Sequence, residues 1–372
     1  MSRVLQLSPG VAPYDATLSL MLGIVRLLRA QGQYRHFDIA ARHVPRGFRI
    51  PGQGIVSNRV QPLDDLDIKK YSAEDVLIYH HGIASDAEQL IRHFPGNRFL
   101  VYHGLTPAGF YLPYNLTVAG RLERGRRELE RLASAFERAY CFSRVTEADL
   151  REAGYLNIRK VDPPLQDVWS ASTDQTFEPR AEVADSPVVL SVGRIVPNKN
   201  HEPLIRMLPY LRRLHPGARL IFAGELRPGL ERYHRHLMDL VRTLDIQNHV
   251  AFTGLLDAKS MERTWKESTH LLCTSLHEGY CLPLVEAMVR NKPVLYLRYG
   301  GSAAAETMDG AGVGFYPADF RIMAELISEV HTNVDLREQI LRTQRERLNQ
   351  LQPAEMSLDI LHQISRPGGV SD

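Results

Sequence analysis

Short apolar runs alternate along the chain with longer stretches whose apolar residues recur at helical spacing. In the stretch 16–30, for example, leucine, methionine and valine stand three or four residues apart, which predicts an amphipathic helix. Strands of the first half are expected at 4–7, 37–42, 75–79, 98–102, 138–142 and 158–161, and helices at 16–30, 121–135 and 146–153. Residues 45–70, rich in Pro, Gly and Asp, are expected to be irregular.

The same alternation starts again in the second half. Strands are expected at 187–192, 219–223, 249–253, 270–275, 293–297 and 311–315, and helices at 201–215, 230–244, 258–267, 283–290, 320–331, 335–351 and 354–364. Strands that alternate with helices form parallel sheets with helical crossovers. The pattern therefore predicts an α/β protein built from two Rossmann-like, doubly wound domains that face a cleft.

A change in composition separates the two halves. Residues 163–187 contain several prolines and many serines, threonines and aspartates, which is typical of an interdomain linker. The length of 372 residues also favours two domains over one core. We expect an N-terminal domain over 1–165, a linker over 166–186 and a C-terminal domain over 187–352.

Composition excludes several classes of protein. The chain is 44% hydrophobic and 24% charged, as expected of a globular protein, and its net charge of +2 argues against a nucleic-acid partner. Cys141, Cys273 and Cys281 form no CxxC pair, so we interpret them as reduced thiols of a cytoplasmic protein. The N-terminus lacks the apolar core of a signal peptide. Because no window reaches the ~18 apolar residues of a membrane span, any membrane contact would be peripheral.

The helix expected at 121–135 is strongly basic but also carries three glutamates. Mixed charges of this kind favour a solvated helix face. A patch for an anionic or lipid-linked molecule at the inner face of a membrane is the alternative.

The stretch 274–293 is the first candidate for a site. It reads as the end of a buried strand, a tight loop with Glu278, and a helix with Pro283 in its first turn and Glu286 one turn further on. The unpaired N–H groups of a helix start can bind phosphate or sugar oxygens, and a carboxylate can accept from a vicinal diol. The alternative is a surface helix with one capping and one solvated glutamate.

Other strand ends of the second half carry residues suited to a diphosphate. Gly193 and Arg194 follow a buried strand, Lys199 lies before the next helix, and Glu225 ends the strand after that. Arg holds two phosphate oxygens at once and Lys adds a point charge, so both could stabilise a departing nucleoside diphosphate. The sequence shows no nucleophile–base pair and no metal-ligand spacing, so we expect neither a cofactor nor a metal.

Two strands of the first half are expected to end in His-Gly, at His81 and at His103. A histidine at the carboxyl end of a strand is well placed for hydrogen bonding or proton transfer in a doubly wound sheet. Gly10 lies in the turn-rich loop 8–15 that follows the first strand. An ordinary strand-to-helix turn explains Gly10 equally well.

These motifs together resemble those of the family 4 retaining glycosyltransferases of the GT-B fold. The resemblance is carried by Gly-Arg-Ile-Val-Pro-Asn-Lys-Asn at 193–200 and by the Glu-x7-Glu signature at 278–286, and it covers the second half. Tyr-His-Gly-Leu-Thr-Pro at 102–107 resembles the histidine motif of members that build cell-surface polysaccharides or lipopolysaccharide.

The resemblance implies a role for each residue. Arg194 and Lys199 would bind the donor diphosphate, Glu286 the ribose, and Glu278 the hydroxyls of the transferred sugar. His103 would lie at the reacting side of the sugar. The remaining donor-binding positions would be Gly10, Gly193, Glu225, Gly279, Tyr280, Cys281 and Leu282. A helix within 353–372 would pack back on the first domain.

The resemblance also implies metal-independent transfer of a hexose with retention at the anomeric carbon. The donor would be GDP-mannose or a UDP-hexose, and the acceptor a saccharide or a lipid-linked precursor. Two departures from the pattern stand out: Cys281 replaces a usual glycine, and Pro9-Gly10-Val11 replaces a Gly-Gly pair. A non-hydrolysing nucleotide-sugar epimerase and a non-catalytic binding subunit remain alternatives. A dehydrogenase is disfavoured because G-x-G-x-x-G follows no predicted strand.

Overall fold

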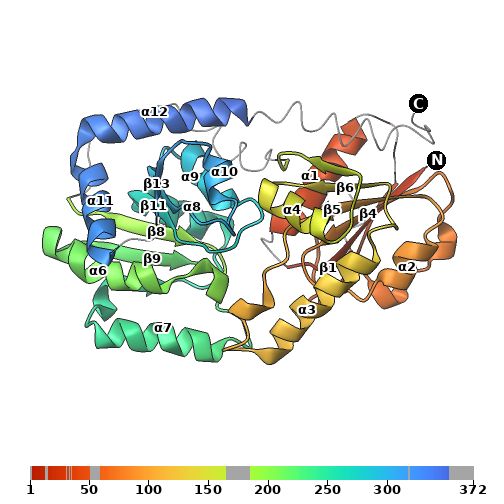
Figure 1. Ribbon diagram of the computed structural model, residues 1–372, viewed down its shortest axis with the longest axis horizontal. Coiled ribbons are helices and arrows are strands. Elements are labelled where there is room, and N and C mark those ends of the chain that lie inside the picture. The colour runs from red at the N-terminus through yellow and green to blue at the C-terminus, as the bar shows by residue number, and fades with distance from the viewer. Residues whose placement is uncertain are drawn as a thin grey trace. The chain divides into compact units, whose positions relative to one another are not determined.

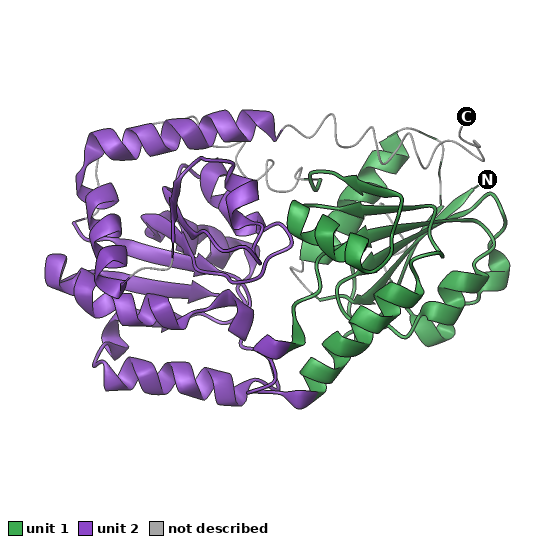
Figure 2. Cartoon of the chain, viewed as in Figure 1, with its two compact units in different colours: residues 1–108, 117–167, 352–372 green, residues 109–116, 168–351 purple. Residues whose placement is uncertain are grey.

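The computed structural model describes residues 2–12, 16–30, 32, 34, 36–50, 59–164, 185–316 and 319–351. The chain divides into two compact α/β units (Figures 1 and 2). The described residues of 1–108 and 117–167 form unit 1, and those of 109–116 and 168–351 form unit 2. The linker predicted at 166–186 lies almost entirely outside the described residues, as does the whole of the C-terminal helix predicted within 353–372.

Unit 1 contains a parallel sheet of seven strands in the order β3-β2-β1-β4-β5-β6-β7. The strands are β1 (Arg3–Gly10), β2 (His36–His43), β3 (Gln61–Pro62), β4 (Val76–His81), β5 (Asn97–Tyr102), β6 (Arg138–Cys141) and β7 (Ile158–Lys160), and the α-helices are α1 (Ala16–Ala30), α2 (Glu88–His93), α3 (Leu116–Arg131) and α4 (Arg144–Glu152). All six residues of β4 are buried, as expected of a strand covered on both faces. The strand order reverses direction between β1 and β4.

Unit 2 contains a second parallel sheet, of six strands, in the order β10-β9-β8-β11-β12-β13. Its strands are β8 (Val188–Val192), β9 (Arg219–Ala223), β10 (Val250–Phe252), β11 (His270–Cys273), β12 (Val294–Leu297) and β13 (Val313–Phe315). Its α-helices are α6 (Glu202–Leu214), α7 (Glu231–Thr243), α8 (Ala258–Glu267), α9 (Leu282–Val289), α10 (Ala304–Met308), α11 (Phe320–Thr332) and α12 (Val334–Gln350). The order reverses between β8 and β11. Ligands of doubly wound sheets bind at such a reversal, beyond the carboxyl ends of the strands.

A short segment from the first half of the chain belongs to unit 2. Nδ2 of Asn115 donates to the carbonyl of Gly229 at 2.6 Å, and the ring of Tyr114 lies edge-on to that of Tyr233 with 5.0 Å between the ring centres. The hydroxyl of Tyr111 donates to the side-chain oxygen of Asn198 at 3.3 Å. Helix α3 thus begins in unit 2 and continues in unit 1.

Several predicted boundaries were wrong. β1 continues through the expected loop to Gly10, because it pairs with β2 as far as His43. His80 and His81 lie inside β4 and do not follow it. The basic helix begins at Leu116, and the short helices α2 and α10 were not predicted. The fold class was confirmed: both units are doubly wound parallel sheets.

None of the helices in the described part of the chain is both long enough and apolar enough to cross a bilayer.

Candidate functional site

The loop after β8 brings Lys199 back across the end of its own strand. Gly193 has a φ of +138°, a conformation that side chains disfavour. A Cβ atom on Gly193 would lie 3.2 Å from both Cε and Nζ of Lys199. Glycine therefore gives the lysine side chain room to lie over the strand end. Arg194, the next residue, is exposed.

Lys199 and Glu278 form an ion pair at the reversal between β8 and β11. Nζ of Lys199 lies 2.5 Å from Oε1 of Glu278, and the two side chains are only 18% and 11% exposed. Burial is the largest single influence and lowers the pKa of Lys199, but Glu278, Cys281 and Cys273 together outweigh it, and the net pKa is raised. The ammonium group is therefore charged at neutral pH.

Hydrogen bonds connect the loop that contains Lys199 to the loop that contains Glu278. Asn198 Nδ2 donates to the carbonyl of His277 at 3.1 Å, and the amide of Leu276 donates to the carbonyl of Asn198 at 2.9 Å. Two residues after Asn198, the carbonyl of Asn200 accepts from Thr274 Oγ1 at 2.8 Å. Sequence reasoning missed Asn198 and Thr274, although both lie within or beside the two recognised motifs.

Glu278 is held from its other side by the loop before α10. The backbone of Glu278 forms a parallel bridge with Ser302, and the amide of Ala303 donates to the carbonyl of Glu278 at 3.1 Å. Thr307 Oγ1 donates to the carbonyl of Tyr280. Gly279 and Tyr280 thus lie in a loop fixed at several points before α9 begins.

Helix α9 begins directly after this loop. Cys281 precedes it with a φ of +74°, Leu282 is its first residue, and a proline follows in the first turn. Glu286 lies on α9 and is partly buried. Burial raises the pKa of Glu286, and Arg290 and Lys199 partly oppose that rise. Because burial disfavours the charged form of Glu286, hydrogen-bond donors on a ligand would stabilise its carboxylate.

The loops after β8 and β9 touch through their backbones. A Cβ atom on Gly224 would lie 2.0 Å from the carbonyl oxygen of Gly193, so only glycine fits there. The amide of Ile195 donates to the carbonyl of Glu225 at 2.9 Å. The carboxylate of Glu225 forms a half-exposed ion pair with Arg227 at 3.5 Å. The described contacts thus place Glu225 beside the Arg194 loop.

Gly10, His81 and His103 belong to unit 1, whereas the other predicted site residues belong to unit 2. Gly10 is the last residue of β1, and its carbonyl accepts from Ser8 Oγ at 2.6 Å. His103 follows β5, as predicted, and its Nε2 lies 3.1 Å from Nδ1 of His80.

The buried contacts of Gln6 fix which nitrogen of each histidine carries a proton. Gln6 Nε2 donates to the carbonyl of Met21 at 2.8 Å, so its Oε1, 2.7 Å from Nε2 of His80, must accept. Burial lowers the pKa of His80 well below its usual value, so this ring is neutral. With its proton on Nε2, His80 can only accept at Nδ1. Nε2 of His103 therefore donates. Because loss of solvent lowers the pKa of His103 to about 4, its Nδ1 carries a lone pair at neutral pH.

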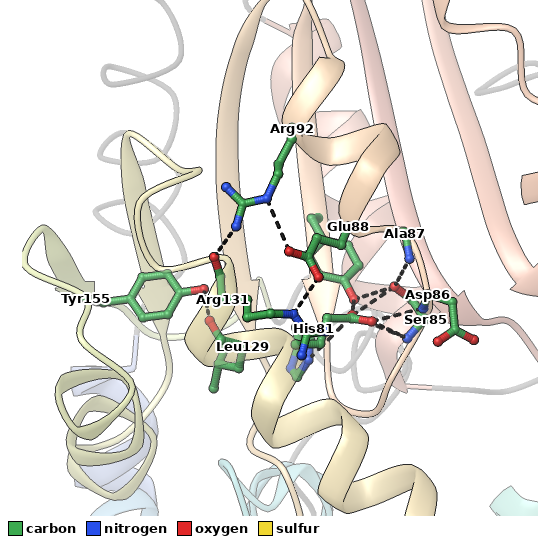
Figure 3. A network of polar contacts seen from close by, with 11 residues as sticks. His81, Ser85, Asp86, Ala87, Glu88, Arg92, Leu129, Arg131 and Tyr155 are labelled. Carbon is green, nitrogen blue, oxygen red and sulfur yellow. Dashed lines mark hydrogen bonds and ion pairs between the residues drawn. The ribbon is translucent and has the colours of Figure 1, made fainter.

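A second buried network in unit 1 contains Glu128 of α3, which is 2% exposed. Figure 3 labels its members His81, Ser85 and Asp86. Its carboxylate accepts from the hydroxyls of Tyr79 and Ser85 at 2.5 and 3.0 Å, and from the amide of Asp86 at 2.9 Å. His81 is fully buried with Nε2 3.8 Å from Glu128, and burial lowers its pKa to about 4. Placing Glu128 on a solvated helix face was therefore wrong, and His81 packs in the core of the unit.

The two doubly wound sheets define the GT-B class of fold. Sucrose-phosphate synthase from Thermosynechococcus elongatus has the same fold, with a TM-score of 0.70 at 16% identity and 98% of each chain covered. Residues 172–347 match the family model described as "Glycosyl transferases group 1". The resemblance to GT-B glycosyltransferases is thereby confirmed.

Curated relatives match mainly over the second half. An uncharacterized glycosyltransferase, MJ1607, of Methanocaldococcus jannaschii is 26% identical over 164 residues, 44% of this chain and 40% of that protein. A D-inositol 3-phosphate glycosyltransferase of Kineococcus radiotolerans is 30% identical over 185 residues, 45% of this chain and 42% of that protein. The chain thus spans about two fifths of the length of these relatives.

Proposed function

We propose that this protein is a retaining, metal-independent glycosyltransferase that moves a hexose from a nucleotide-diphosphate sugar to a saccharide or lipid-linked acceptor. The observation that carries the proposal is the ion pair between Lys199 and Glu278. It lies at the strand reversal of unit 2, before the start of α9, and the loop after β8 that contains Lys199 also carries the exposed Arg194. A cation for phosphate and a carboxylate for hydroxyls are thus within one side-chain length of each other.

Donor binding would redistribute the hydrogen bonds of this pair. The ammonium group of Lys199 would turn toward the diphosphate, where Arg194 binds a second pair of oxygens. Glu278 would then accept from hydroxyls of the sugar, next to backbone N–H groups of Gly279, Tyr280, Cys281 and Leu282. Glu286, whose pKa burial raises, would accept from the two ribose hydroxyls.

The transfer step would follow a front-face course. The bond between the anomeric carbon and the diphosphate oxygen breaks, and the acceptor hydroxyl adds from the same face. Its proton passes to the departing diphosphate oxygen, so the enzyme needs no nucleophile. Arg194 and Lys199 would stabilise the charge that grows on the diphosphate. His103 would accept a hydrogen bond from a sugar hydroxyl through Nδ1.

GDP-mannose and UDP-hexoses are the donors we expect, in polysaccharide or lipopolysaccharide biosynthesis. Peripheral membrane contact through the basic helix stays a prediction. Two arginines of this helix already have acidic partners within the protein: Arg126 pairs with Glu152 at 3.4 Å and Arg131 with Glu88 at 2.7 Å. These two charges are therefore less available to an anionic membrane surface.

The proposal is tested by ligand-induced stabilisation. A ligand present at 100 times its Kd raises the free energy of unfolding by about 2.7 kcal/mol and so raises Tm. GDP, UDP and their sugars would be compared with and without EDTA, in the wild type, in Arg194→Ala and in the control Arg321→Ala, which changes an exposed arginine of α11. We expect one nucleotide class to stabilise the wild type and the control regardless of EDTA. Loss of a charge-assisted contact of about 1.5–3 kcal/mol should weaken binding to Arg194→Ala by about 10- to 100-fold.

Product analysis separates the alternatives. Incubation with the donor alone should leave the sugar unchanged, whereas an epimerase would interconvert it. With an acceptor, nuclear magnetic resonance of the product should show the anomeric configuration of the donor. If no nucleotide stabilises the protein at millimolar concentration, the donor site drawn here is wrong and the binding-subunit interpretation replaces it.

A further inference from the structure

Two cysteines lie side by side at the same end of the sheet in unit 2. Cys273 is the last residue of β11, and Cys281 precedes α9. Their sulfur atoms are 3.6 Å apart and both residues are buried. A carboxylate oxygen of Glu278 completes a group whose three ligand atoms all lie within 4.8 Å of one another. Cys141, on β6 of unit 1, is no member of this group.

The backbone at Cys281 is unusual for a cysteine. Its φ of +74° is in the left-handed region, where residues with a side chain are strained and glycine is not. In this conformation Cys281 contacts the sulfur of Cys273. A glycine would relieve this strain but would lose the buried sulfur atom and its contact with Cys273. The thiol pair itself is therefore the feature that needs a chemical explanation.

We propose that Cys273, Cys281 and Glu278 form a binding site for a thiophilic divalent cation such as Zn²⁺. Tetrahedral zinc with Zn–S bonds of about 2.3 Å separates two thiolate sulfurs by about 3.8 Å. The observed separation of 3.6 Å needs only a small adjustment. A carboxylate oxygen is an ordinary third ligand for zinc, and the fourth position is left for water.

The charges at the site balance when the cation is bound. Two thiolates and one carboxylate carry three negative charges, and a divalent cation leaves a single negative charge. The ammonium group of Lys199 lies 2.5 Å from Oε1 of Glu278, so it can neutralise that charge. Binding releases the thiol protons, so the cation binds more tightly as pH rises.

The cation would take up the carboxylate that the proposed transfer reaction uses for sugar hydroxyls. Metal and donor therefore compete for Glu278, so the bound cation would inhibit this protein; we call this inhibition the metal-dependent brake. This consequence rests on the proposed function, whereas cation binding itself does not. The cation takes no part in the transfer step.

Cobalt provides a direct probe, because tetrahedral thiolate–Co²⁺ complexes have a near-ultraviolet charge-transfer band and visible d–d bands. The protein would be titrated with Co²⁺ under a phosphine reductant that does not chelate metal. We expect saturation at one cobalt per chain and displacement by Zn²⁺. Cys273→Ser should weaken cobalt binding by more than about 100-fold, the upper end of what loss of an outer-shell partner costs. Cys141→Ser, which alters the third buried cysteine, should bind like the wild type.

A second variant guards against misfolding. Cys281→Gly suits the left-handed backbone and should melt no lower than the wild type, yet lose the charge-transfer band. A wild type without the band, or a band that persists in both Cys273→Ser and Cys281→Gly, overturns the proposed site.

The brake is tested separately from the site. Zn²⁺ should raise the KM of the wild type for the donor, EDTA should reverse this, and Cys273→Ser should be insensitive. Normal transfer in zinc-saturated wild type refutes competition. A cobalt band in a protein without transferase activity supports the site and counts against the proposed function alone.

Discussion

Replacing Glu128 by alanine should strongly destabilise the part of unit 1 around the loop after β4 and helix α3. Glu128 is almost fully buried, and its carboxylate connects the loop after β4 to helix α3 through hydrogen bonds. It accepts from the backbone amides of Ser85 and Asp86 and from the hydroxyls of Ser85 and Tyr79. Asp86 has a φ of +56°, so this loop needs outside support.

The magnitude follows from what each substitution leaves unpaired. Alanine leaves two backbone N–H groups and two hydroxyls without this acceptor, and because a single buried unsatisfied donor costs about 1–3 kcal/mol, we expect a total loss of about 3–5 kcal/mol. Glutamine keeps one oxygen for the amides of Ser85 and Asp86, while the hydroxyls of Tyr79 and Ser85 can rotate to accept from its NH2 group. We expect Glu128→Gln to cost about 1–3 kcal/mol.

Hydrogen exchange measured by mass spectrometry localises the effect. A loss of 3 kcal/mol speeds exchange through local opening by about 100-fold, since each 1.4 kcal/mol is tenfold. Faster exchange is expected in peptides covering 82–87 and 116–131, with peptides from α8 unchanged. The control is Glu130→Ala, on the same helix but exposed, which should change stability by less than about 0.5 kcal/mol. Equal exchange in Glu128→Ala and Glu130→Ala would refute the reasoning.

Three further results are expected. Gly224→Ala should lower Tm and nucleotide binding because its Cβ meets backbone, whereas Gly300→Ala, with no atom within 4 Å, should do neither. Burial lowers the pKa of His81 to about 4 and of His270 to about 3, so below pH 6.5 the unfolded chain binds protons that the native chain does not. The free energy of unfolding, measured by urea denaturation, should therefore fall as pH is lowered from 6.5 to 4, by about 1.4 kcal/mol per pH unit per histidine, and by less in His270→Asn. Gln6→Leu should mix the histidine tautomers, visible in ¹⁵N chemical shifts.

The periodicity of the sequence predicted those elements whose pattern is local. Strand 219–223 and helix 258–267 have the bounds that apolar spacing gives them. The end of β1 could not be predicted in this way, because Gly10 becomes a strand residue only through pairing with His43. His80 and His81 are polar residues in the sequence, but they lie in a central strand that is covered on both faces. Both side chains are therefore fully buried in the core, where burial keeps them neutral.

The candidate site shows the same division. Lys199 and Glu278 could be selected because each follows an apolar strand, and the order of the strands then brings them together. Asn198, Thr274 and Tyr111 could not, since their partners are backbone carbonyls or side chains far away in the sequence. The contact between Cys273 and Cys281 depends on one left-handed residue, and no periodicity reports such a residue.

The candidate group of unit 2 is charged at neutral pH, whereas the candidate histidines of unit 1 are neutral. In unit 2, Glu278 helps to keep Lys199 charged, which suits the contact with a diphosphate that we propose for it. In unit 1, burial keeps His80 neutral and lowers the pKa of His103 to about 4, so neither ring is a useful proton acceptor at neutral pH. His103 therefore suits hydrogen bonding better than general base catalysis, which works best when the pKa lies near the working pH. In the proposed transfer the departing diphosphate accepts the proton of the acceptor hydroxyl, so no other base is needed. A charged Lys199 to stabilise the diphosphate and a neutral His103 to accept a hydrogen bond are therefore sufficient for the proposed mechanism.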